Sequence, residues 1–149
     1  VQEGVMAHYP VTDVKVTVYD GSFHPVDSSE ICFKIAGAGA VKKGLSQAHP
    51  ALLEPIMTIT VTVPEDFTGD IIGDLNTKRA QLQGMNPTDG TNVIQALVPL
   101  AEVQNYAIAL KSITQGRGSF TVAFSHYQEV PTHITQKIIE EKQKQAVKA

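Results

Sequence analysis

Two Val-Pro steps, Val63-Pro64 and Val98-Pro99, constrain the fold of this chain more than any other feature. They lie 35 residues apart, and each ends a run rich in β-branched residues and precedes residues with helical spacing. Proline suits the first turn of a helix because the N–H that it lacks would have no partner there. The repeat therefore predicts two copies of a strand-to-helix unit.

The spacing of apolar residues around these steps predicts six elements. We expect them, in chain order, at Leu52–Val63 (strand), within Pro64–Met85 (helix), and at Gln83–Pro87 (strand), Asn92–Val98 (strand), Val103–Thr114 (helix) and Ser119–Glu129 (strand). Asp89-Gly90 suits a hairpin corner between the second and third strands. This order is that of a ferredoxin-like βαββαβ sandwich, with two helices on one face of a four-stranded antiparallel sheet. The predicted fold class is α+β.

The first of these helices carries Gly69 and Gly73, four residues apart. A glycine inside a helix costs about 1 kcal/mol relative to alanine, so the pair predicts a close approach of the helix to the sheet. We also expect this helix to continue far enough to bury Leu82, with Lys78 and Arg79 near its C-terminal end, where cations are favoured.

The first fifty residues predict a strand and a helix joined by a short loop. Val11–Asp20 alternates between apolar and polar residues, as a half-buried strand does. Asp27 is expected to cap a helix that starts near Ser28 and ends near Pro50, with Glu30 completing a capping box. Five residues are expected to form its inward stripe, and Cys32 is expected to be a small buried residue. The stripe comprises Ile31, Ile35, Ala38, Val41 and Leu45.

The loop Gly21–Val26 is the best local candidate for a binding site in this part of the chain. It places Phe23, His24 and Pro25 at a tip between two ordered elements, where binding residues tend to occur. A histidine beside an aromatic residue can hydrogen-bond to RNA or stack on its bases. A single exposed histidine is more often only solvated, and the residues alone leave both interpretations open.

Composition excludes several classes of protein. The net charge of −3 gives no overall attraction for nucleic acid, and one cysteine cannot form an internal disulfide. The five histidines show no recurring ligand spacing, so no metal site is predicted. Gly37, Gly39, Lys42 and Lys43 lack the order of a phosphate loop, and the small residues of this stretch are expected to lie at a close helix contact. No secretory or membrane-length apolar run is visible, so a cytoplasmic location is expected.

Six stretches in order resemble the C-terminal part of translation elongation factor G, the ribosomal translocase GTPase. They read YPVTDVKVTVYDGSFHPVDSSE, LLEPIM, PEDFTGDIIGDLNTKRAQLQGM, VPLAE, YAIALKSITQGRG and FSHYQEVP. The resemblance implies that residues 1–50 are the C-terminal half of the fourth (tip) domain, which is a partial βαβ-type, ribosomal-protein-like domain. It also implies that residues 51–131 are the ferredoxin-like fifth domain, and residues 132–149 are expected to form a C-terminal helix and tail.

The same resemblance implies a function and its residues. The chain is expected to be a fragment of a longer protein, a monomeric ribosome-contacting arm with no enzyme activity of its own. GTP and magnesium would belong to the full-length parent. Its partners would be ribosomal RNA and proteins and the tRNA and mRNA at the decoding site, with no membrane or DNA. Two sets of contact residues follow. The tip loop contributes Ser22, Phe23, His24 and Pro25, and the large-subunit candidates are Lys78, Arg79, Gln115 and Arg117.

Two alternatives stay open at this point. One is the arm of a paralogous GTPase that recycles or protects ribosomes, because such proteins share the arm but differ in tip chemistry. The tip of this chain has Pro25 where the family usually has aspartate. The other is a stand-alone ferredoxin-like domain that binds a metabolite or acts as a small enzyme, because this fold hosts many functions.

Overall fold

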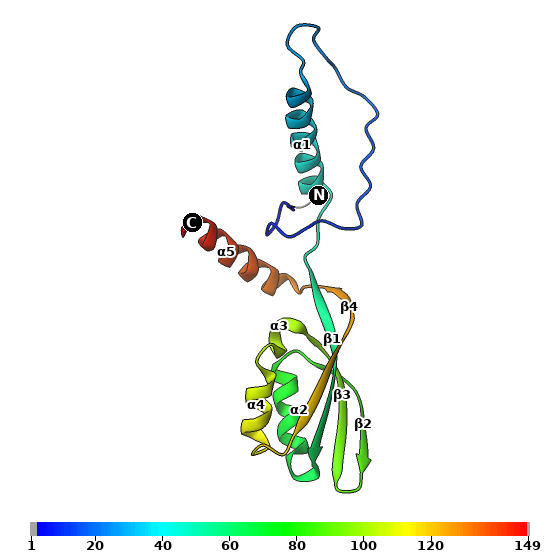
Figure 1. Cartoon of the computed structure of the whole chain (residues 1–149), viewed down its shortest axis with the longest axis vertical. Coiled ribbons are helices and arrows are strands. Elements are labelled where there is room, and N and C mark those ends of the chain that lie inside the picture. The colour runs from blue at the N-terminus through cyan, green and yellow to red at the C-terminus, as the bar shows by residue number, and fades with distance from the viewer. Residues whose placement is uncertain (1–2, 149) are drawn as a thin grey trace. The chain divides into compact units, whose positions relative to one another are not determined.

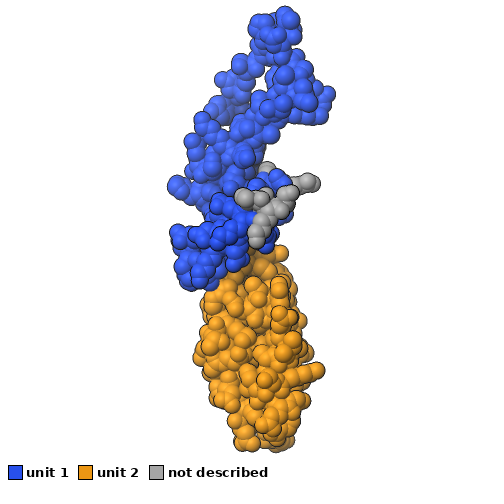
Figure 2. Space-filling view, turned by 90° about the vertical axis from the view of Figure 1, so that its left-hand side faces the viewer, with its two compact units in different colours: residues 1–52, 130–149 blue, residues 53–129 orange. Residues whose placement is uncertain are grey.

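A computed structural model of the chain describes residues 3–148. The chain divides into two compact units, one made of residues 1–52 with 130–149 and the other of residues 53–129 (Figure 2). Each unit is described by itself below. No helix in the described part of the chain combines the length and the apolar character needed to cross a membrane.

The unit of residues 53–129 has the predicted ferredoxin-like fold (Figure 1). Its sheet has the strand order β2-β3-β1-β4, and all neighbouring strands are antiparallel. The helices lie on one face of this sheet (Figure 1). The elements are β1 (Leu53–Pro64), the short 3₁₀ helix η1 (Glu65–Phe67), α2 (Thr68–Thr77), β2 (Gln81–Thr88), β3 (Thr91–Pro99), α3 (Leu100–Val103), α4 (Tyr106–Ile113) and β4 (Ser119–Glu129).

The core of this unit follows from strand alternation. Ile59, Val61 and Val63 on β1 are at most 1% exposed, while the threonines between them are only partly buried. The helix residues that close the core from the other side are Ile71, Leu75, Tyr106 and Leu110. Burying each large apolar side chain contributes roughly 1.5–3 kcal/mol. The alternation in β1 and β3 therefore determines which face of the sheet the helices cover.

The hairpin between β2 and β3 turns at the predicted residues. Asp89 and Gly90 have φ of 39° and 78°, the left-handed pair that a two-residue hairpin turn requires.

Helix α2 ends earlier than the pattern predicts. The N–H of Ala80 donates to the carbonyl of Leu75 (3.0 Å), and the N–H of Arg79 donates to that of Asn76 (3.3 Å). These two bonds form a Schellman motif, with Arg79 at φ 57° in the position that glycine usually takes. The motif reverses the chain into β2, where Leu82 is 43% exposed, so its predicted burial in the helix is wrong.

The expected packing role of Gly69 and Gly73 is also wrong. Both glycines lie on the exposed side of α2, and a Cβ added at either would meet no atom within 4 Å. The helix reaches the sheet through Ile71 and Leu75 instead.

Residues 11–20 in the other unit do not form the predicted strand (Figure 1). A strand is stable only when a neighbour pairs with its backbone groups, and no strand of this unit lies among the described residues to supply one. Val14, Val16 and Val18 are consequently 43%, 55% and 87% exposed. The predicted strand at residues 11–20 is therefore wrong.

Helix α1 (Glu30–Gln47) forms where it was expected, but its capping and burial differ. Ser29 is the N-cap residue and makes no side-chain capping bond, while Glu30 pairs with Lys34 rather than completing a capping box. Ile31 and Ile35 are 65% and 67% exposed, and Leu45 is the buried residue of the stripe. Cys32 is exposed, contrary to expectation. Gly37 and Gly39 lie within α1 with no neighbour within 4 Å of an added Cβ, so the close helix contact expected there is absent from the described residues.

The predicted C-terminal helix is present as α5 (Thr132–Lys148). Its apolar stripe of Ile134, Ile138 and Ile139 packs on a small cluster formed by Ala7, Leu52 and Val130. The N–H of Val130 also donates to the carbonyl of Leu52 (2.8 Å). This unit is therefore assembled from the two ends of the chain.

Candidate functional site

The tip loop is exposed and locally ordered by hydrogen bonds. The N–H of His24 donates to Oγ of Ser28 (2.7 Å), and the N–H of Ser28 donates to the carbonyl of His24 (3.1 Å). Phe23 is 75% exposed, and it lies with Ser22 and Pro25 in a stretch whose residues are all exposed. Ser28, just before α1, therefore holds the loop backbone, while the side chains of the loop are exposed to solvent.

The ring of His24 uses only one of its nitrogens for internal contacts. Nδ1 lies 3.4 Å from the N–H of Val26 and 3.3 Å from Oδ2 of Asp27. Nδ1 accepts in the first contact and donates in the second, so the two contacts exclude each other and depend on where the proton sits. In the state that accepts from Val26, Nε2 carries the proton and is available as a donor to a ligand.

The thiol of Cys32 lies close behind the loop. Oγ of Ser29 donates to Sγ (3.1 Å), and this hydrogen bond is the main reason that the pKa of Cys32 is lowered from its ordinary value. A backbone hydrogen bond from Ser29 lowers the pKa further, and desolvation opposes the shift weakly. The sequence did not indicate the contact between Ser29 and Cys32, because Cys32 was expected to be buried and is exposed.

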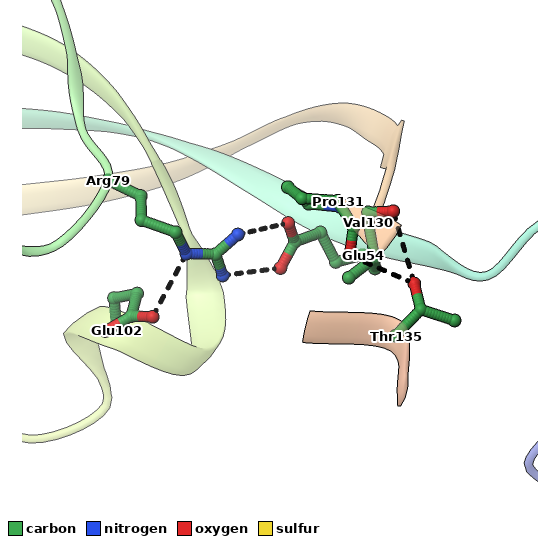
Figure 3. A network of polar contacts seen from close by, with 6 residues as sticks. All are labelled: Glu54, Arg79, Glu102, Val130, Pro131 and Thr135. Atoms are coloured by element: carbon green, nitrogen blue, oxygen red, sulfur yellow. Dashed lines mark hydrogen bonds and ion pairs between the residues drawn. The ribbon is translucent and has the colours of Figure 1, made fainter. Parts of the chain in front are cut away.

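Arg79 is the centre of an ion-pair network in the ferredoxin-like unit (Figure 3). Its Nη1 and Nη2 atoms donate to the two carboxylate oxygens of Glu54 on β1 at 2.8 and 2.9 Å, and its Nε donates to Glu102 on α3 at 3.2 Å. The hydrogen bonds to Glu54 are the largest cause of the raised pKa of Arg79. The residue predicted to face a partner is thus occupied by contacts within its own unit.

Lys78 is also paired within the unit. Its Nζ lies 2.7 Å from Oδ1 of Asp74, and the two side chains are only 21% and 17% exposed. Asp74 precedes Lys78 by four residues, and an acid four residues before a base commonly pairs with it on a helix, so the sequence could have indicated this ion pair. Oδ2 of Asp74 and the hydroxyl of Tyr106 are both buried and have no hydrogen-bond partner in the described structure. Burial is the main cause of the raised pKa of the Tyr106 phenol, and the charge of Asp74 raises it further.

Gln115 and Arg117 lie in the turn that follows α4. Gln115 and Gly116 are both left-handed, with φ of 53° and 83°, and the N–H of Gly118 donates to Oγ1 of the fully buried Thr114 (2.9 Å). The guanidinium carbon of Arg117 lies 4.8 Å from the centre of the Phe67 ring. The structure thus confirms the turn, whereas nothing in the sequence indicated that Arg117 contacts Phe67.

The predicted contact residues therefore form three separate groups. Ser22, Phe23, His24 and Pro25 share the tip loop of one unit, while Lys78 with Arg79 and Gln115 with Arg117 lie at two places in the other. Lys78 and Arg79 are paired with acids of their own unit, whereas Arg117 has no ion pair among the described residues. Within the described residues, no three His, Cys, Asp or Glu side chains gather in a way that could hold a metal ion.

Two protein-family models match the chain in consecutive segments. The model described as elongation factor G, domain IV, matches residues 1–49, and the model described as elongation factor G C-terminus matches residues 51–138. The matches meet close to the start of β1.

Individual relatives agree with these matches. Over 141 residues, 95% of its length, the chain is 53% identical to elongation factor G of Aquifex pyrophilus, of which it covers 20%. A crystal structure of a protein from Thermus thermophilus is similar over 96% of the chain, with a TM-score of 0.79 and 45% identity, and the chain covers 22% of it. The chain thus spans about a fifth of the length of these relatives.

Proposed function

This chain belongs to the elongation factor G family, and we propose that it is a ribosome-contacting arm of a translocase that moves tRNA and mRNA through the ribosome. The proposal is supported by two family matches in the order of the parent protein and by an exposed loop where the tip domain would need one. We assign GTP and magnesium binding to other residues of the longer protein. The arm would act in the cytoplasm, as part of a monomeric factor, and would contribute contacts rather than catalysis.

The observation that carries the proposal is the arrangement of His24. Its backbone is hydrogen-bonded to Ser28, and in the state whose Nδ1 accepts from Val26 its Nε2–H is available to an oxygen acceptor. An ordered loop loses less conformational freedom on binding than a disordered one, so this donor is prepared for a contact with RNA or with a tRNA–mRNA pair.

The ferredoxin-like unit would supply the contact with the large ribosomal subunit. Of its four candidate residues, Lys78 and Arg79 are paired with acids of the unit. Arg117 has no ion pair among the described residues and still has its N–H edge for an acceptor. We therefore assign the direct contact to the turn of Gln115 and Arg117 and a supporting role to Lys78 and Arg79.

Translocation kinetics test the role of His24. In the full-length factor that contains this chain, His24→Ala is expected to slow single-turnover translocation about tenfold or more, as for a lost hydrogen bond to a charged group. His133→Ala is the matched control, because His133 is an exposed histidine in the first turn of α5. Translocation at the wild-type rate by His24→Ala would contradict the assignment.

Pro25 gives one reason to test a recycling or protection factor of the same family. Proline after His24 fixes the backbone and leaves no side-chain charge at that position, which would alter tip chemistry. A full-length protein that splits ribosomes together with recycling factor but does not translocate would assign it to the recycling function. A protein that translocates and does not split ribosomes would assign it to elongation.

A further inference from the structure

Phe67 and Arg117 form a cation–π pair that joins two parts of the ferredoxin-like unit that are distant in the sequence. Phe67 ends the 3₁₀ helix before α2, and Arg117 lies in the turn between α4 and β4. The guanidinium carbon lies 4.8 Å from the ring centroid, within the range of an attractive cation–π contact.

Both partners of this pair are held in place by the fold. The ring of Phe67 is partly buried and packs against the hydrophobic core. On the other side, the N–H of Arg117 donates to the carbonyl of Thr114 (3.0 Å), and Oγ1 of Thr114 donates to the carbonyl of Leu110 (2.7 Å). The turn backbone and the ring are therefore fixed before any ligand arrives.

The charges of the unit make the placement of Arg117 important for binding an anion. Residues 53–129 contain four lysines and arginines against eight aspartates and glutamates, so the unit as a whole repels a polyanion. Lys78 and Arg79 are already neutralised by acids of the unit. Among the described residues, Arg117 has no ion pair, although Glu65 and Asp66 directly precede Phe67 in the sequence. Binding of an anion at this turn consequently depends on the orientation of the Arg117 guanidinium.

We propose that Phe67 is a positioning residue that holds Arg117 flat against its ring, so that the free N–H edge of the guanidinium can bind an RNA phosphate with two hydrogen bonds. The planar fork of arginine suits this geometry, and stacking covers a face of the group without using its donors. The proposal rests on the proposed function, because it takes ribosomal RNA as the partner.

Two measurements on the 149-residue chain test this role, with three variants and one control variant. The first is the NMR shift of the Arg117 side-chain protons, which the Phe67 ring displaces when the pair is stacked. The second is filter binding to purified large ribosomal subunits across a salt series. Phe67→Leu removes the ring, Phe67→Tyr keeps it, and Arg117→Lys keeps the charge without the planar group. Phe124→Leu is the matched control, because Phe124 is an exposed aromatic residue that contacts Tyr127 rather than a cation.

We expect Phe67→Leu to abolish the ring-induced shift and to weaken binding about two- to fivefold, with Phe67→Tyr near wild type on both measurements. Arg117→Lys should weaken binding to a similar extent, and Phe124→Leu should leave it unchanged. Thermal unfolding of each variant identifies any that fails to fold. If Phe67→Leu does not fold, the test relies on Arg117→Lys, which leaves the Phe67 ring packed against the core.

Three results would overturn the proposal, and they are distinguishable. If the wild-type chain binds and Phe67→Leu and Arg117→Lys bind equally well, the positioning role is wrong while the proposed function stands. If the ring-induced shift is absent from the wild-type chain, the stacked pair itself is wrong. If the wild-type chain does not bind large subunits at any salt concentration, the large-subunit contact fails, and the role of Phe67 fails with it.

Discussion

The guanidinium of Arg79 meets the carboxylate of Glu54 edge to edge, with two hydrogen bonds of 2.8 and 2.9 Å across 25 residues of sequence. A third bond from Nε to Glu102 brings α3 into the same network. Because Glu54 is only 13% exposed, the pair is shielded from solvent more than a surface ion pair is. The end of α2 is thereby tied to the start of β1.

Loss of Arg79 should destabilise the ferredoxin-like unit. Arg79→Gly removes the ion pairs while suiting the left-handed backbone at φ 57°, so its effect isolates the side chain. We expect a loss of about 1–3 kcal/mol in the free energy of unfolding, measured by urea denaturation, because Glu54 and Glu102 remain partly buried without a partner. Lys111→Ala, at an exposed residue of α4, is the control and should change stability by less than about 0.5 kcal/mol. Equal effects of the two variants would contradict this prediction.

Tyr106 should make the unit less stable in alkali. Its folded-state pKa is raised, so above about pH 10 the unfolded chain releases the phenolic proton while the folded chain keeps it. The free energy of unfolding is therefore unaffected by this group below about pH 10 and falls as pH rises beyond it. Urea denaturation of wild type and Tyr106→Phe from about pH 8 to 11 checks this, and the variant should lose part of the alkaline decrease.

At neutral pH, Tyr106→Phe should change the free energy of unfolding little. The hydroxyl of Tyr106 is buried without a hydrogen-bond partner, so its removal eliminates an unsatisfied polar group and leaves the edge-on contact with Phe120 intact. A loss of more than about 2 kcal/mol at neutral pH would show that the hydroxyl has a partner, such as a buried water.

Replacing Gly73 with alanine should stabilise the chain. The residue lies on the exposed side of α2, and an added Cβ would meet no atom within 4 Å. The gain expected from helix propensity is about 0.5–1 kcal/mol, measured by urea denaturation. Gly118→Ala is the contrasting variant, because its Cβ would lie 3.0 Å from Leu110 and Thr114 and should destabilise the unit. Destabilisation by Gly73→Ala would restore the packing role that the sequence suggested.

The thiol of Cys32 should react with iodoacetamide faster than an ordinary exposed cysteine at neutral pH. Its pKa is lowered mainly by the hydrogen bond from Oγ of Ser29, so more of it is thiolate at a given pH. Ser29→Ala should move the midpoint of the rate against pH upward. Because the chain has one cysteine, the measured rate reports this site alone. An unchanged midpoint would contradict the role of Ser29.

The sequence predicted the ferredoxin-like unit because its signals are local. The Val-Pro steps, the alternation of β1 and the turn at Asp89-Gly90 each require only neighbouring residues. Contacts between residues that are far apart in the sequence have no local pattern that predicts them. Nothing in the order of residues indicates that Arg79 meets Glu54, or that Phe67 lies beneath Arg117.

Burial in the other unit was predicted less well, for a related reason. Val14, Val16 and Val18 alternate with polar residues, but a period does not specify which element covers the apolar face, and no strand forms there. The tip loop around His24 was located correctly as an exposed turn, whereas its internal bonds to Ser28 and Asp27 became apparent only from the structure.

The assembly of one unit from both ends of the chain has a consequence for the order of events during synthesis. The cluster that joins Ala7 and Leu52 to Val130 cannot form until Val130 has been made, whereas residues 53–129 are continuous and complete before that point. At typical rates of translation the intervening residues take roughly 4–16 s to make. Residues 1–52 therefore acquire their full set of contacts later than residues 53–129, although they precede them in the chain.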